Sequence, residues 1–121
     1  MSFHPTIHDR LEPILRLVFE DREAGLKQLL DLAESGDESA ILYLGLYLSE
    51  KRETEDASLK WLMLADDFES ADAAWNLAMI ARERGNLEEM RQWIDRAAYL
   101  GEVDAKAIQK NGYDVASVIS Q

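Results

Sequence analysis

Cysteine is absent from this chain of 121 residues, and histidine is scarce. Without cysteine the chain can form no disulfide, no thiolate zinc site and no thiol nucleophile, so nothing indicates an oxidising compartment. The two histidines, His4 and His8, lie near the N-terminus on either side of Pro5. Their spacing could place them on one face of a helix, but Pro5 interrupts that helix. We therefore expect no metal site there.

The sequence also lacks a long apolar run and a recognisable targeting signal. No segment approaches the roughly 20 apolar residues that a membrane-spanning helix needs. Residues 1–5 contain no basic stretch followed by an apolar core, which is the pattern of a secretory signal. We therefore expect a cytoplasmic protein without a membrane partner.

Motifs that carry catalysis are missing as well. The chain contains no glycine-rich phosphate loop, no nucleophile elbow and no EF-hand loop. Adjacent acidic pairs such as Glu88 and Glu89 are common in any protein with 24 acidic residues, so they carry little information about acid–base chemistry. The sequence therefore predicts no catalytic residue, no cofactor and no enzyme activity.

Negative charge is the strongest feature of what is present. The chain has 24 acidic and 13 basic residues, a net charge of −11, and residues 37–70 hold nine of the acidic residues but three of the basic ones. This balance argues against nucleic acid and against anionic membrane surfaces, since both attract basic proteins. Two interpretations stay open: the charge only keeps the protein soluble, or it attracts a basic partner.

The central part of the chain repeats a two-helix pattern. Residues 58–66 recur as residues 90–98, with Trp61 and Trp93 in register 32 residues apart. At a step of 33 residues, the matching positions are Ala40 and Ala73, Leu44 and Leu77, and Gly45 and Ala78. A period in the low thirties with two helices per unit is typical of a helical solenoid. We predict an all-α, right-handed α-solenoid of about six or seven helices, with both tryptophans in its core.

Capping and turn residues place the helix boundaries. We expect helices at about 9–20, 21–36, 38–49, 56–68, 70–85, 87–100 and 104–110. Ser70 or Asp72 caps the fifth, residues 50–55 form a charged turn, and Pro13 makes the regular part of the first helix start late. The chain is one domain, 1–121, with a partial repeat at 22–52, repeats at 38–69 and 71–101, and a capping segment at 103–121.

These repeats resemble the Sel1-like branch of the tetratricopeptide-type repeats over residues 26–108. The matching residues are Ala40, Leu44, Gly45, Leu48, Ser58, Leu59, Lys60, Trp61 and Ala65 in one unit, and Ala73, Leu77, Ala78, Trp93, Ala97 and Ala98 in the next. The linker between Tyr47 and Trp61 is closer to the tetratricopeptide length than to the Sel1-like length. The resemblance implies a superhelical scaffold that acts through protein–protein contacts.

The first helix of each unit contains apolar residues in addition to those expected in its core. They stand at positions where a helix normally places polar residues that face water. They are Leu42, Tyr43, Leu46 and Tyr47 in one helix, and Trp75 and Met79 in the other. By the resemblance, these positions face the concave side and form an apolar strip. Exposed strips of this kind mark binding sites. The alternative is that the first helix or the C-terminal tail covers the strip.

Acidic residues complete the predicted partner site. Asp72 borders the strip, and Asp66, Asp67 and Glu69 lie beside it in sequence, although these three could be only a solvated helix end. Apolar anchors within an acidic rim suit a basic, partly apolar protein surface. We favour a stoichiometric inhibitor, which resembles bacterial immunity proteins that neutralise cationic nuclease toxins. The alternative is an adaptor or chaperone-like module that holds a peptide or client in its concave groove.

Overall fold

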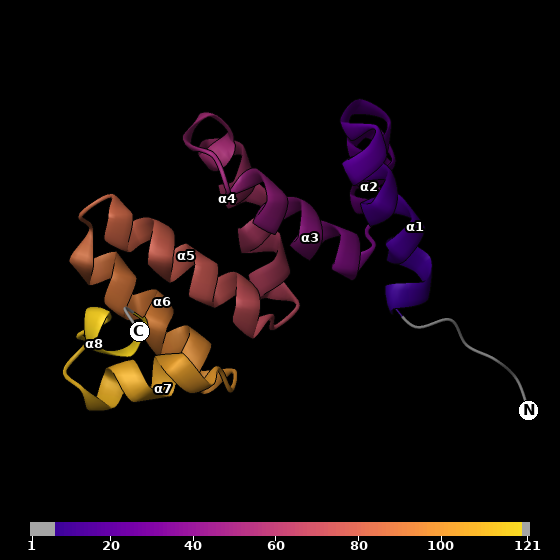
Figure 1. Cartoon of the computed structure of the whole chain (residues 1–121). Coiled ribbons are helices and arrows are strands. Elements are labelled where there is room, and N and C mark those ends of the chain that lie inside the picture. The colour runs from indigo at the N-terminus through magenta and orange to yellow at the C-terminus, as the bar shows by residue number, and fades with distance from the viewer. Residues whose placement is uncertain (1–6, 120–121) are drawn as a thin grey trace, which may run out of the picture.

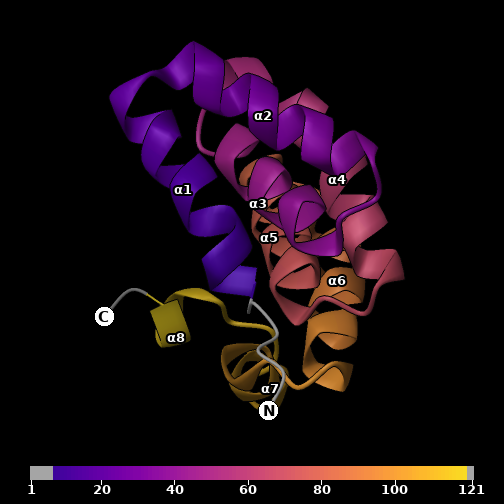
Figure 2. The same ribbon diagram turned by 90° about the vertical axis from the view of Figure 1, so that its right-hand side faces the viewer.

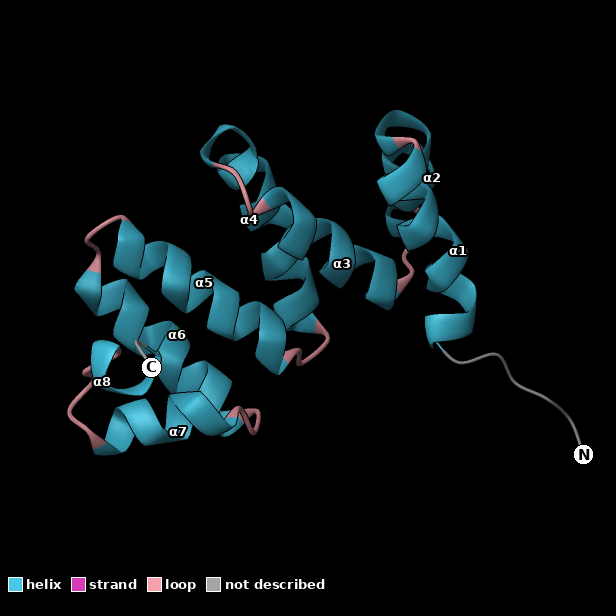
Figure 3. Cartoon of the chain, in the orientation of Figure 1, coloured by secondary structure: helices cyan, strands magenta, loops and turns pink. Residues whose placement is uncertain are grey.

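The computed structural model describes residues 7–119, with side chains from Leu11 onward. In this range it contains eight helices and no strand (Figures 1 and 3). The helices are α1 (Ile7–Glu20), α2 (Arg22–Glu34), α3 (Glu38–Leu48), α4 (Arg52–Asp67), α5 (Ala71–Glu83), α6 (Leu87–Tyr99), α7 (Val103–Lys110) and α8 (Ala116–Ile119). The predicted all-α class is confirmed. Among the described helices, none combines the length and the apolar content needed to cross a bilayer.

Each helix packs mainly on its neighbours in sequence, and additional contacts join α1 to α3 and α3 to α5. In Figure 2, α1 and α8 lie to the left, α4 and α6 to the right, and α3 and α5 between them. The connections are short loops, which keep consecutive helices adjacent (Figure 3). The right-handed superhelical course of these pairs stays a prediction.

Two clusters of buried apolar side chains meet at α5. The first is built from α1 to α5 and includes Leu62, and the second is built from α5 to α8 and includes Ile94. α5 contributes Leu77 to the first cluster and Ala78 to the second, and Trp93 packs against both. α5 is therefore apolar on two faces, which is expected only of a helix enclosed on both sides.

Burial follows the sequence repeat. Ala33, Ala65 and Ala97, which lie 32 residues apart, are 2%, 1% and 0% exposed. Leu62 and Ile94, one step apart, are both fully buried, whereas Leu30, one step earlier, is 37% exposed. The first unit therefore departs from the others on α2.

Two glycines mark close helix crossings. A Cβ atom on Gly45 would lie 2.9 Å from Cδ2 of Leu62, so α3 approaches α4 closely at this point. A Cβ atom on Gly25 would lie 2.5 Å from Cα of Val18, so α2 approaches the backbone of α1 even more closely. Nothing in the sequence repeat marks the Gly25 crossing, so it was not predicted.

The predicted helix caps are largely confirmed. The Asp21 carboxylate accepts a hydrogen bond from the Ala24 amide at 3.3 Å, and the Ser70 hydroxyl accepts one from the Ala73 amide at 3.1 Å. Ser70, and not Asp72, is thus the cap of α5. Past α7, Val115 is 3% exposed and packs into the second cluster, so the tail covers the end of that cluster.

Two predicted helix starts were wrong. α4 begins at Arg52 and not near residue 56, and the predicted charged turn is mostly helix. Glu53 and Glu55 favour this first turn because acidic side chains stabilise a helix N-terminus. The Thr54 hydroxyl also donates a hydrogen bond to the Leu48 carbonyl oxygen at 2.6 Å, which ties the start of α4 to the end of α3.

α1 begins at Ile7 and contains Pro13 in its interior, contrary to the predicted late start. Proline there removes one backbone hydrogen-bond donor and costs about 3 kcal/mol. The helix persists because its inner face is buried. Leu11 is 1% exposed, and Ile14 and Leu15 pack against the first cluster.

Candidate protein-binding groove

An apolar groove opens between α1, α2 and α3, with a volume of about 800 Å³. Three of the predicted partner-binding residues, Tyr43, Leu46 and Tyr47, line it. The other apolar lining residues are Leu15, Val18, Phe19 and Leu29. The groove is therefore the place where the structure brings most of the predicted α3 residues together.

Helical spacing explains why these side chains converge. On α3, Tyr43 and Tyr47 are one turn apart and thus share a face, and on α1 Leu15 and Phe19 are related in the same way. Leu29 of α2, which is 1% exposed, also lines the groove. The Phe19 side chain is 95% exposed, so the lining of the groove includes a large aromatic ring that is almost fully in contact with solvent.

Charges of both signs surround the groove. Glu12, Arg16, Arg22 and Glu50 line it together with the apolar residues. Arg16 donates a hydrogen bond to Glu12 at 2.7 Å, and both side chains are more than half exposed. Exposed pairs of this kind contribute little to stability. The lining of the groove therefore favours a ligand with apolar groups more than a ligand of one particular charge.

The other apolar residues of the predicted strip lie elsewhere. Leu42 is half-buried and packs against the first cluster, whereas Trp75 and Met79 are half-buried and pack against the second. None of these three is among the residues that line the groove. Five of the six predicted apolar residues thus pack against two different clusters, and the sixth, Tyr47, lines the groove.

The predicted acidic residues divide into two kinds. Asp67, Glu69 and Asp72 are exposed around the turn between α4 and α5. Asp66 is half-buried and accepts a hydrogen bond from Nε of Arg96 at 3.0 Å, which ties α4 to α6. This hydrogen bond raises the pKa of Arg96 above its ordinary value, against the opposing effect of burial. Asp66 therefore has a structural partner within the chain.

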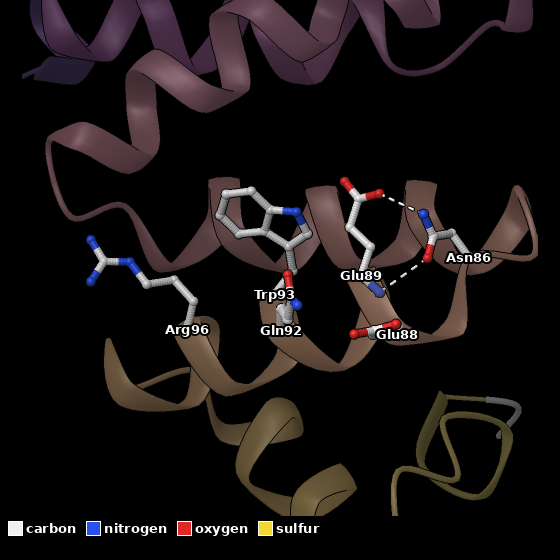
Figure 4. Close-up of a pocket in the computed structure, with 6 residues that line it drawn as sticks. All are labelled: Asn86, Glu88, Glu89, Gln92, Trp93 and Arg96. Carbon is white, nitrogen blue, oxygen red and sulfur yellow. Dashed lines mark hydrogen bonds between the residues drawn. The ribbon is translucent and has the colours of Figure 1, made fainter.

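A second hollow, with a volume of about 480 Å³, lies along α6 and was not predicted (Figure 4). It is lined by Asn86, Glu88, Glu89, Gln92, Trp93 and Arg96. The repeat placed Trp93 in the core together with Trp61. Trp61 is indeed 7% exposed, but Trp93 is only half-buried and faces this hollow. The two rings occupy equivalent positions in the repeat, so the repeat does not predict their different burial. That difference comes from the elements that pack beside the helix carrying each ring.

The apolar wall that α1 contributes to the groove was also missed. Val18 and Phe19 of α1 line the groove, and helical spacing alone does not separate a side chain in the core from one in a groove wall. Among the described side chains, no group of three or more histidine, aspartate or glutamate residues is placed to hold a metal ion. His4 and the side chain of His8 lie outside the described part of the chain.

Compared with known proteins, the chain matches no family model, no curated protein and no solved structure. The resemblance to Sel1-like repeats thus rests on the sequence alone.

Proposed function

We propose that this chain acts without catalysis, by binding another protein, and that the favoured partner is a basic protein which it inhibits stoichiometrically. The observation that carries the proposal is an open apolar groove with aromatic walls on a protein of net charge −11. Tyrosine and phenylalanine are enriched at the centres of protein interfaces. The partner would be met in the cytoplasm.

The groove is suited to apolar side chains from a basic segment of the partner. Its volume of about 800 Å³ lies within the range of ligand-binding clefts. Phe19, at 95% exposed, would gain the most burial on binding, and Tyr43 and Tyr47 offer ring faces and hydroxyls from the opposite wall. Apolar groups would supply the affinity.

The negative charge of the protein would speed its association with a basic partner. Asp67, Glu69 and Asp72 are exposed, and no ion pair among the described residues involves them. A strongly acidic protein attracts a basic one over long range and speeds association, and salt weakens this effect. This behaviour supports an inhibitor similar to immunity proteins, since a nuclease-like target must expose a basic surface for nucleic acid.

An adaptor or chaperone-like module is the second candidate. The mixed charges around the groove favour it, because a peptide chosen by apolar side chains would need no strong positive charge. Both candidates are compatible with a Sel1-like or tetratricopeptide-type superhelix. That architecture is supported by the repeated burial of alanines 32 residues apart and by the contacts of α1 with α3 and of α3 with α5.

Replacing the exposed groove aromatic should weaken partner binding. We expect Phe19→Ala to reduce affinity by about tenfold, because buried aromatic anchors carry most of an interface's binding energy. The fold should stay intact, since Phe19 is 95% exposed. Val103→Ala is the matched control, because Val103 is 74% exposed on α7 and does not line the groove. Affinity is measured by isothermal titration with the partner.

The two candidate roles are separated by capture from the native cell's lysate at low and high salt, followed by association kinetics. For an inhibitor, one basic protein is retained at a one-to-one ratio, and a variant with Asp67→Asn, Glu69→Gln and Asp72→Asn associates more slowly. For an adaptor, several clients are retained at either salt concentration and only Phe19→Ala weakens binding. Retention that is insensitive to both sets of changes would refute the groove as the binding site.

A further inference from the structure

The hollow along α6 combines an aromatic ring with carboxylates. Trp93 and Glu89 are one helical turn apart, and in Figure 4 their side chains extend from α6 in the same direction. Nδ2 of Asn86 donates a hydrogen bond to Oε2 of Glu89 at 2.8 Å, and the Glu89 amide donates one to Oδ1 of Asn86 at 3.1 Å. This reciprocal cap orients the Glu89 carboxylate at the start of α6, next to the indole.

The carboxylates of the hollow are not neutralised by neighbouring cations. Neither Glu88 nor Glu89 takes part in an ion pair among the described residues. The hollow's one cation, Arg96, is engaged elsewhere: its Nε donates to Oδ1 of Asp66 at 3.0 Å, and its Nη2 donates to the Asp66 carbonyl oxygen at 3.3 Å. The hollow therefore presents an excess of negative charge beside a half-buried indole.

Two other aromatic rings of the protein already carry cations. Lys60 lies over Trp61, with its ammonium 4.6 Å from the ring centroid, and the Arg91 guanidinium lies 5.2 Å from the centroid of Tyr113. Neither of these pairs involves Trp93. Tryptophan is the aromatic side chain that attracts cations most strongly.

We propose that this hollow binds one basic side chain, preferably arginine, from the surface of the partner protein. A guanidinium can stack on the indole of Trp93 while its N–H groups donate to the carboxylate of Glu89, and Glu88, which also lines the hollow, adds negative charge from another side of α6. The inference rests on the proposed binding of a basic protein and adds a defined contact on α6, separate from the groove between α1 and α3. It also assigns a role to Glu88 and Glu89, the adjacent acidic pair of α6.

The test uses the whole protein and a minimal probe, N-acetylarginine amide. In a ¹⁵N-labelled sample, the indole N–H signal of Trp93, assigned by comparison with Trp93→Phe, should shift in a saturable way. The citrulline analogue, which has nearly the same shape without the charge, should leave it unmoved. Glu88→Gln together with Glu89→Gln should weaken probe binding about two- to fivefold for each carboxylate removed. Glu23→Gln with Glu34→Gln, two exposed sites on α2, is the control and should change little.

The possible outcomes separate the two proposals. Equal shifts of the Trp93 signal with the arginine and citrulline probes would overturn the cation site. So would equal affinity of the arginine probe for the Glu88→Gln and Glu89→Gln double variant and for the Glu23→Gln and Glu34→Gln control. If Trp93→Phe does not fold, the glutamine variants still decide the question, because both glutamates are exposed. A basic partner that binds the Glu88→Gln and Glu89→Gln double variant as tightly as the original protein would overturn this contact and leave the proposed function standing. A Trp93 site that responds to arginine while no basic protein is captured would overturn the proposed function and the partner as the source of the arginine, but not the cation site itself.

Discussion

Gly25→Ala is expected to lower the free energy of unfolding by about 3 kcal/mol, the upper part of the range for overpacked sites. The added methyl carbon would lie 2.5 Å from Cα of Val18, and the atom in its way belongs to backbone, which cannot rotate aside as a side chain can. α1 would have to move away from α2, and the groove that both helices line would change with it. Urea unfolding followed by circular dichroism measures the loss.

Gly36→Ala serves as the comparison for this result. Gly36 has φ +96°, but no atom lies within 4 Å of an added Cβ, so only backbone strain opposes the change. We expect a cost of about 1 kcal/mol there. A Gly25→Ala protein as stable as Gly36→Ala would contradict the close crossing of α1 and α2.

Leu62→Ala is expected to cost about 4 kcal/mol. Leu62 is fully buried in the first cluster and contacts the α3 crossing at Gly45, so truncation leaves a cavity in addition to the lost apolar burial. Leu30→Ala is the matched control, because Leu30 is the same residue type one repeat step earlier but is 37% exposed. We expect it to cost less than about 1 kcal/mol. Similar losses at both sites would contradict the departure of the first unit from the repeat.

Sequence reasoning was most accurate where a single local interaction decides the structure. Asp21 and Ser70 cap helices because their side chains can reach an amide three residues ahead, and Gly36 ends α2 with a positive φ. The inner stripes of α3 and α5 follow from helical spacing combined with the repeat. The caps are determined within about one helical turn and the stripes by a pattern visible in the sequence, so neither requires knowledge of the tertiary structure.

The errors arose where tertiary packing decides the structure. The burial of Leu11 outweighs the cost of Pro13 within α1, and neither residue alone indicates this. Trp61 and Trp93 occupy equivalent repeat positions, yet only Trp61 is buried in the core. The candidate site shows the same limit: Tyr43 and Tyr47 were identified as apolar residues left over from the core, but the wall that α1 places opposite them was not.

Because α5 packs against both clusters, it affects how the protein unfolds in part. Unfolding either half alone would expose the alanine and leucine side chains that α5 gives to that half, so fraying of α1 to α4 and fraying of α6 to α8 are coupled through one helix. Amide protons of α5 should consequently exchange with solvent only through global unfolding. A ligand held at the groove between α1, α2 and α3 would slow exchange in α5 as well, because it lowers the population of the globally unfolded state through which α5 exchanges.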